Sequence, residues 1–207
     1  LEALEKGLPN LLRHVENITN VYNLPCVVAI NAFPTDTKAE LDLVESKCRE
    51  LGVNVRLSEV WAKGGEGGLA LAEEVVRLCD EPNHFQFVYD VNDSIEDKLN
   101  AIATKVYHAD GVVIAASAKK QLKQLTELGF DKLPICMAKT QFSFSDDASK
   151  LGAPRGFKIT VRDLKVNAGA GFLVAKTGDI MTMPGLPKVP SAEKIDVDEN
   201  GKITGLF

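Results

Sequence analysis

The stretch Cys26–Ser58, CVVAINAFPTDTKAELDLVESKCRELGVNVRLS, decides the fold class. Its first residues, Cys26–Ala32, form a short apolar run that predicts a buried strand. Thr37 and Glu40 have the spacing of a helix capping box, and apolar residues recur behind them at helical spacing until a glycine. Val53–Ser58 then predicts a second strand. A strand–helix–strand unit of this kind implies a right-handed crossover between parallel strands.

The same alternation continues toward the C-terminus. Further strands are expected at Phe85–Tyr89, Gly111–Ala115 and Leu133–Met137, and further helices at Leu69–Cys79, from Ser94, and at Ser117–Leu128. We therefore expect an α/β fold, in which a mostly parallel, Rossmann-like sheet has helices on both faces.

The pattern changes after Phe142. Residues 142–156 are rich in Ser, Asp, Gly and Pro and predict a long surface loop. Strands are expected at Phe157–Val166 and Phe172–Ala175, and a hairpin that turns at Asn200-Gly201 is expected near the end. We predict a single α/β domain over residues 1–207, with a βα-alternating core over 1–141 and a β-rich tail over 157–207.

Composition narrows the class of protein. The 207 residues are 45% hydrophobic and 26% charged with a net charge of -5, which is typical of a soluble globular protein and argues against a partner such as nucleic acid or an anionic membrane. No apolar run approaches the roughly 20 residues of a membrane-spanning helix. The four cysteines and three histidines lack metal-ligand spacing, so we expect no metal site, and we expect the cysteines to be buried in the reducing cytoplasm.

Ligands of open parallel sheets bind beyond the carboxyl ends of the strands. The loop Glu59–Gly68 follows the second strand and holds the chain's one tryptophan beside four glycines. It is no Walker loop, because G-x-x-x-x-G-K-[ST] occurs nowhere in the chain. Two interpretations stay open: a flexible connection with Trp61 packed into the core, or a loop whose backbone approaches a ligand.

Two aromatic residues follow neighbouring strand ends. Phe33 and Trp61 are expected at the same edge of the sheet, where they would form a slot for a flat ring. The alternative is that each is an ordinary core or rim aromatic. A second glycine-rich stretch, Asn167–Gly171, precedes strand-like residues, so a tight turn is favoured there over a dinucleotide loop.

These motifs resemble formate–tetrahydrofolate ligase (10-formyltetrahydrofolate synthetase). The resemblance is carried in order by NAFPTDT, EVWAKGGEGG, AKTQ, NAGAGF and TGDIMTMPGLPK, which begin at Asn31, Glu59, Ala138, Asn167 and Thr177, and it runs over residues 1–207. It implies that the chain is the carboxy-terminal part of a longer, cytoplasmic, homotetrameric enzyme of one-carbon metabolism. The nucleotide-binding P-loop, the Mg²⁺ site and the catalytic residues would then lie in the missing amino-terminal part.

The resemblance also implies a reaction and a site. Formate attacks the γ-phosphate of ATP to give formyl phosphate, and N10 of tetrahydrofolate takes the formyl group. The folate-binding residues of the family correspond to Phe33, Pro34, Leu57 and Trp61. The family pattern is also matched at Lys63, Glu66, Lys139 and the stretch Thr177–Pro187. These residues could form a wall of the active site, or they could serve only to stabilise the fold of the domain.

Two hypotheses follow from these expectations. In the first, the chain is the folate-binding part of the ligase, holds no tightly bound cofactor, and is inactive without the rest of the parent chain. In the second, it is a non-catalytic scaffold that serves packing or homo-oligomer assembly.

Overall fold

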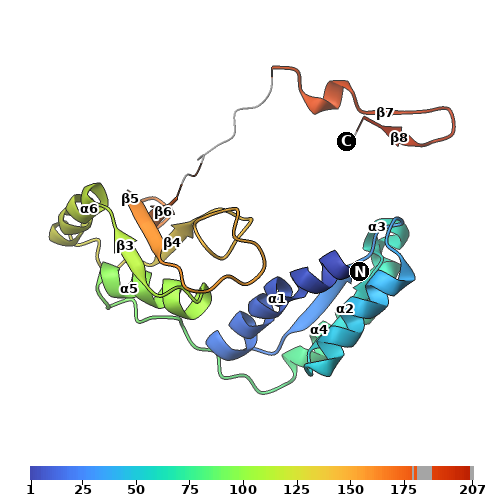
Figure 1. The fold of residues 1–207 in the computed structure, drawn as a ribbon, viewed down its shortest axis with the longest axis horizontal. Coiled ribbons are helices and arrows are strands. Elements are labelled where there is room, and N and C mark those ends of the chain that lie inside the picture. Colours follow the sequence, from blue (N-terminus) through green and yellow to red (C-terminus); the bar gives the residue numbers. More distant parts are fainter. Residues whose placement is uncertain (179, 181–187, 206–207) are drawn as a thin grey trace.

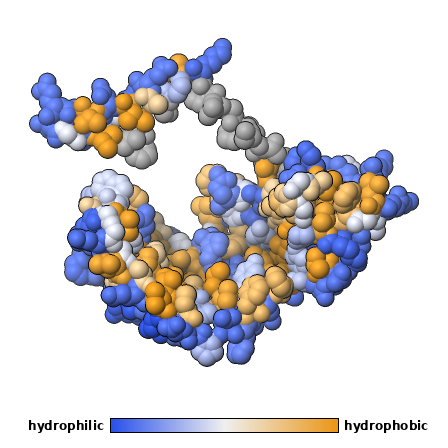
Figure 2. Space-filling view, turned by 180° about the vertical axis from the view of Figure 1, so that it is seen from behind, coloured by the Kyte–Doolittle hydropathy of each residue, from blue (hydrophilic) through white to orange (hydrophobic). Residues whose placement is uncertain are grey.

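The computed structural model describes residues 1–178, 180 and 188–205, so most of the Thr177–Pro187 stretch lies outside the described residues. The fold is a mixed α/β arrangement of two lobes and a C-terminal hairpin, seen from the front in Figure 1 and from behind in Figure 2. The N-terminal lobe contains α1 (Glu2–Glu16), the π-helical turn η1 (Asn17–Val21), β1 (Val27–Asn31), α2 (Lys38–Glu50), β2 (Asn54–Ser58), α3 (Val60–Lys63), the 3-10 turn η2 (Gly64–Gly68) and α4 (Leu69–Cys79). The second lobe contains α5 (Ile95–Ala101), the π-helical turn η3 (Ile102–Val106), β3 (Val112–Ile114), α6 (Ala116–Glu127), β4 (Ile135–Ala138), β5 (Ile159–Asn167) and β6 (Phe172–Thr177). The short turn η4 (Ser191–Glu193) precedes the hairpin of β7 (Asp196–Val197) and β8 (Ile203–Thr204).

The N-terminal lobe is built on the strand–helix–strand unit predicted for Cys26–Ser58. Strands β1 and β2 pair in parallel, and Thr37 and Glu40 form the predicted capping box at the start of α2. The core between these elements contains Val28, Cys48 and Val55. The predicted strands and helix are therefore present within one or two residues of their expected bounds.

Helix α4 packs against this sheet through a face that contains Glu74 and Leu78. Glu74 is only 4% exposed and accepts hydrogen bonds from Arg56 of β2 (2.7 Å) and from Arg77 (2.6 Å). The apolar stripe of α4, defined as Ala72, Val75, Val76 and Cys79, is exposed. These four side chains share one face of the helix, and that face is turned to solvent.

The second lobe contains a four-stranded mixed sheet in the order β3-β5-β6-β4. Strand β5 is parallel to β3, β6 is parallel to β4, and β5 and β6 are antiparallel. Helices α5 and α6 pack on the sheet through one core, in which Leu99 and Leu125 meet Val161 and Leu173. The predicted tight turn joins β5 to β6, where the carbonyl of Asn167 accepts two backbone hydrogen bonds.

The predicted α/β class with mostly parallel strands and a β-rich C-terminal segment is confirmed, and two details differ. Phe85–Tyr89 is not a strand, because the backbone N–H of Gln86 bonds to the turn at Tyr22 rather than to a sheet. The expected burial of all four cysteines is wrong for Cys79 and Cys136, which are exposed. Within the described residues, every helix is too short or too polar to cross a membrane.

Candidate functional site

The carboxyl ends of β1 and β2 form the edge at which the sequence places a ligand. The amide of Ala32 donates to the carbonyl of Ser58 at 2.9 Å, so the two chains stay paired just past the strands. The next residue, Phe33, donates its amide to Asp36 Oδ2 at 2.8 Å and accepts a bond from the amide of Asp36 at 3.0 Å. This closed turn, followed directly by the capped start of α2, holds the Phe33 ring at the edge.

The glycine run after β2 is a closed turn. The amide of Glu59 donates to the carbonyl of Gly67 at 3.0 Å, which folds η2 back on the start of α3. A Cβ atom on Gly67 would lie 2.4 Å from the backbone oxygen of Glu59, so this close approach requires glycine. The turn leads into α3, which carries Trp61, and Trp61 is 65% exposed rather than packed into the core.

The Phe33 and Trp61 rings lie next to each other at this edge. Their centroids are 6.4 Å apart with an angle of 48° between the planes, and the residues are 47% and 65% exposed. A flat ring held between two others needs about 3.5 Å on each side, so the pair must turn toward parallel and separate slightly to admit one. Both side chains are exposed enough to make that rotation.

Pro34 and Leu57 lie at the same end of the sheet. Pro34 is exposed in the turn that presents Phe33. Leu57 is 41% exposed and lines a neighbouring hollow of about 390 Å³ together with Ile30 and Asp36. Asp36 thus links the hollow to the turn that holds Phe33.

Lys63 and Glu66 are surface residues of α3 and η2. Lys63 Nζ pairs with Glu59 Oε2 at 2.7 Å, and both side chains are well exposed. Among the described residues, no hydrogen bond or ion pair involves the Glu66 side chain, which is exposed. Lys63 and Glu66 belong to the same segment of α3 and η2 as Trp61.

Lys139 lies in the second lobe, directly after β4. Its ammonium donates to the backbone carbonyls of Thr140, Ser143 and Ser145, and it lies 5.0 Å from the centroid of the Tyr107 ring. Burial lowers the pKa of Lys139 to about 8, with the nearby Asp146 opposing that shift. All three N–H groups of this lysine are used within its own loop, so a substrate would have to displace one of these carbonyls.

The glycine turn is held by its own backbone. The amide that Glu59 donates goes to the carbonyl of Gly67 within the turn. Within the described part of the chain, no group of three or more His, Cys, Asp and Glu side chains is placed to hold a metal ion.

Comparison with protein families identifies the family of the chain. The family model of formate–tetrahydrofolate ligase matches residues 1–207, which is the full length of the sequence. The chain belongs to the formate–tetrahydrofolate ligase family.

Proposed function

We propose that this chain supplies the folate-binding wall of an ATP-dependent formate–tetrahydrofolate ligase. Family membership implies a ligase with tetrahydrofolate and ATP as substrates. The observation that carries the proposal is the exposed Phe33–Trp61 pair at the carboxyl ends of two parallel strands. The pterin ring would insert between these two rings, with Pro34 and Leu57 forming the neighbouring surface.

The proposed role of these residues is binding and orientation. Stacking of a heterocyclic ring on an aromatic side chain contributes about 1–3 kcal/mol. In the proposed mechanism, formyl phosphate made from formate and ATP transfers its formyl group to N10 of tetrahydrofolate. Holding the pterin fixes the position of that amine relative to the acyl group, and such positioning accelerates acyl transfer.

The chain alone is proposed not to make formyl phosphate. The sequence contains no Walker motif, and the glycine turn is closed on itself. The rest of the parent chain would bind ATP with Mg²⁺. We place the enzyme in the cytoplasm, because its cysteines are unpaired.

Titration with tetrahydrofolate tests the proposal. Trp61 is the single tryptophan, so any change in tryptophan fluorescence on adding the folate reports on this residue. Calorimetry should show Kd about 5- to 140-fold higher for Trp61→Ala and for Phe33→Ala, from the stacking energy of about 1–3 kcal/mol. Phe142→Ala is the matched control, because Phe142 is 63% exposed but lies in the second lobe. Equal Kd values for Trp61→Ala and Phe142→Ala would refute the stacking role.

The exposed apolar stripe of α4 favours a second role, in homo-oligomer assembly. Four apolar side chains on one exposed helix face are typical of an interaction site. If the scaffold hypothesis holds, Val76→Glu should lower the mass measured by light scattering, whereas Leu151→Glu, at a loop position that is 75% exposed, should not. A wild-type monomer would contradict this role while leaving the folate proposal untouched.

A further inference from the structure

Helices α1 and α5 end in the same unusual way. Each continues into a π-helical turn, η1 or η3, that is closed by a tyrosine whose amide donates to the carbonyl five residues back. Tyr22 and Tyr107 are the two tyrosines, and the residues after them, Asn23 and His108, have positive φ angles of 53° and 55°. π-helical turns are rare and are frequently found at functional sites, and positive φ is uncommon outside glycine.

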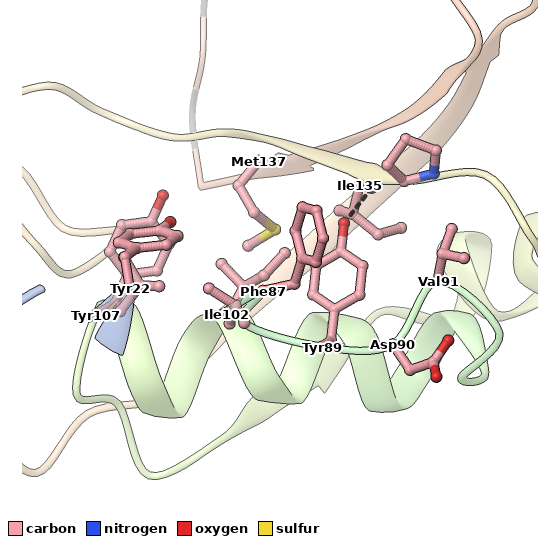
Figure 3. Close-up of a pocket in the computed structure, with 12 residues that line it drawn as sticks. Tyr22, Phe87, Tyr89, Asp90, Val91, Ile102, Tyr107, Ile135 and Met137 are labelled. Atoms are coloured by element: carbon pink, nitrogen blue, oxygen red, sulfur yellow. Dashed lines mark hydrogen bonds between the residues drawn. The ribbon is translucent and has the colours of Figure 1, made fainter. Parts of the chain in front are cut away.

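The two tyrosines line one cavity. It has a volume of about 910 Å³ and lies between η1, the segment 87–91, η3 and the free edge of β4 (Figure 3). Its walls are mainly apolar and include Phe87, Ile102 and Met137. A volume of this size is within the range of small-molecule pockets, which are mostly apolar with a few polar groups that fix orientation.

The polar groups of the cavity lie at its two ends. Figure 3 shows Tyr22 and Tyr107 together at one end and Asp90 at the other. Among the described residues, no group is hydrogen-bonded to either of these two tyrosine hydroxyls, whereas Tyr89 Oη already accepts the amide of Ile135 at 2.9 Å. Burial raises the pKa of Tyr107, so its hydroxyl stays protonated and available as a donor.

The lining also limits the charge of a ligand. Asp90 is its one charged side chain, and it is exposed and accepts bonds from the amide and the side chain of Asn92. The nearby cation Lys139 is absent from the lining and has all its donors on carbonyls. An anion would therefore meet no cationic side chain in the described lining, and a cation would meet only the Asp90 carboxylate at the exposed end, where Asn92 already occupies Oδ1. Within the described residues, the interior of the cavity has no charged side chain that would balance a charged ligand.

We propose that this cavity binds an uncharged planar aromatic compound. Its rings would pack between Phe87, Ile102 and Met137, and an oxygen or nitrogen at its edge would accept hydrogen bonds from Tyr22 and Tyr107. The site is separate from the proposed folate site, because Tyr22 precedes β1 whereas Phe33 follows it.

The test uses prodan, an uncharged naphthalene ketone whose fluorescence shifts to the blue in apolar surroundings, and the 207-residue chain. We expect saturable binding of one prodan per chain. Val106→Trp, which fills the cavity, should weaken binding at least tenfold, and Val113→Trp, at a 46% exposed position of β3 outside the lining, should not. Tyr22→Phe with Tyr107→Phe removes only the two donors and should raise Kd about tenfold.

Each result is decisive for the site. Thermal unfolding followed by circular dichroism shows whether the variants fold. If Val106→Trp does not fold, the double variant Tyr22→Phe with Tyr107→Phe still tests the cavity. Equal affinity of the Val106 and Val113 variants, or unchanged affinity of the double phenylalanine variant, would overturn the proposal. Trp61→Ala should leave prodan binding intact. If it abolishes binding, the probe occupies the aromatic pair and the cavity proposal is wrong, whereas the folate proposal survives.

Discussion

Replacing Gly67 with alanine tests how the glycine turn supports the aromatic pair. The added Cβ would lie 2.4 Å from the backbone oxygen and 2.5 Å from the backbone carbon of Glu59. Because both are backbone atoms, the turn itself must shift by nearly 1 Å to restore normal contact. That shift breaks the hydrogen bond between Glu59 and Gly67, and with the accompanying strain we expect a loss of about 1–2 kcal/mol in the free energy of unfolding.

The matched control is two residues away. Gly65→Ala is expected to be neutral or slightly stabilising, since a Cβ on Gly65 meets nothing within 4 Å. For a chain of this length, the Gly67 loss corresponds to a fall in Tm of roughly 2–8 °C. The shifted turn also displaces α3, so tetrahydrofolate should quench Trp61 fluorescence less in Gly67→Ala than in Gly65→Ala.

Differential scanning calorimetry and a fluorescence titration on the two variants give both numbers. If Gly67→Ala melts and binds like Gly65→Ala, the close approach does not constrain the turn, and the link from the glycine run to Trp61 is wrong. A lower Tm with unchanged quenching would refute only that link.

Three further predictions concern the rest of the fold. Thr37→Ala removes the N-cap of α2 and should cost about 1 kcal/mol in a urea unfolding series, whereas Thr35→Ala, at an exposed position with no capping role, should not. Burial lowers the pKa of Lys139 from 10.5, its ordinary value, to about 8 in the folded chain. Between these two pH values the unfolded chain holds the proton and the folded chain does not, so the contribution of Lys139 to stability rises from about pH 8 to 10.5 and is lost again as the pH falls back to 8. Wild-type protein should therefore gain stability relative to Lys139→Met from pH 7.5 to 9.5 in the same assay; no gain would contradict the lowered pKa. A thiol reagent followed by mass spectrometry should modify the exposed Cys136 well before the buried Cys48, and equal rates would contradict their burial.

Local signals predict most of the elements. The capping box at Thr37 and the turn at Asn167 depend on nearby residues alone, and both are present. A strand also needs a partner distant in sequence, and Phe85–Tyr89 lacks one, although its composition favours a strand. Helical periodicity likewise cannot choose the buried face of α4. The face of α4 that packs against β2 contains Glu74, whose buried carboxylate forms ion pairs with Arg56 and Arg77.

The candidate site is predictable in part for the same reason. Phe33 and Trp61 each follow a strand directly, so the parallel pairing of β1 and β2 brings them to one edge. No comparable sequence pattern predicts the cavity between the lobes, because its residues do not follow paired strands. Tyr22 and Tyr107 are 85 positions apart, and tertiary contacts such as the one between the two π-helical turns bring them together.

Strand β1 joins these two features in one rigid element. Only five residues long, it separates the turn that holds Tyr22 from the turn that holds Phe33, and it is paired along its whole length with β2. The amide of Tyr22, which lies five residues before β1, donates to Asn17 of η1, and the amide of Ala32, just after β1, donates to the carbonyl of Ser58. In the proposed function, folate binding beyond one end would need only a small rotation and separation of exposed rings, and we expect that a ligand can fill the cavity beyond the other end without moving them. Independent effects of Trp61→Ala and Val106→Trp on the two ligands would be the consequence.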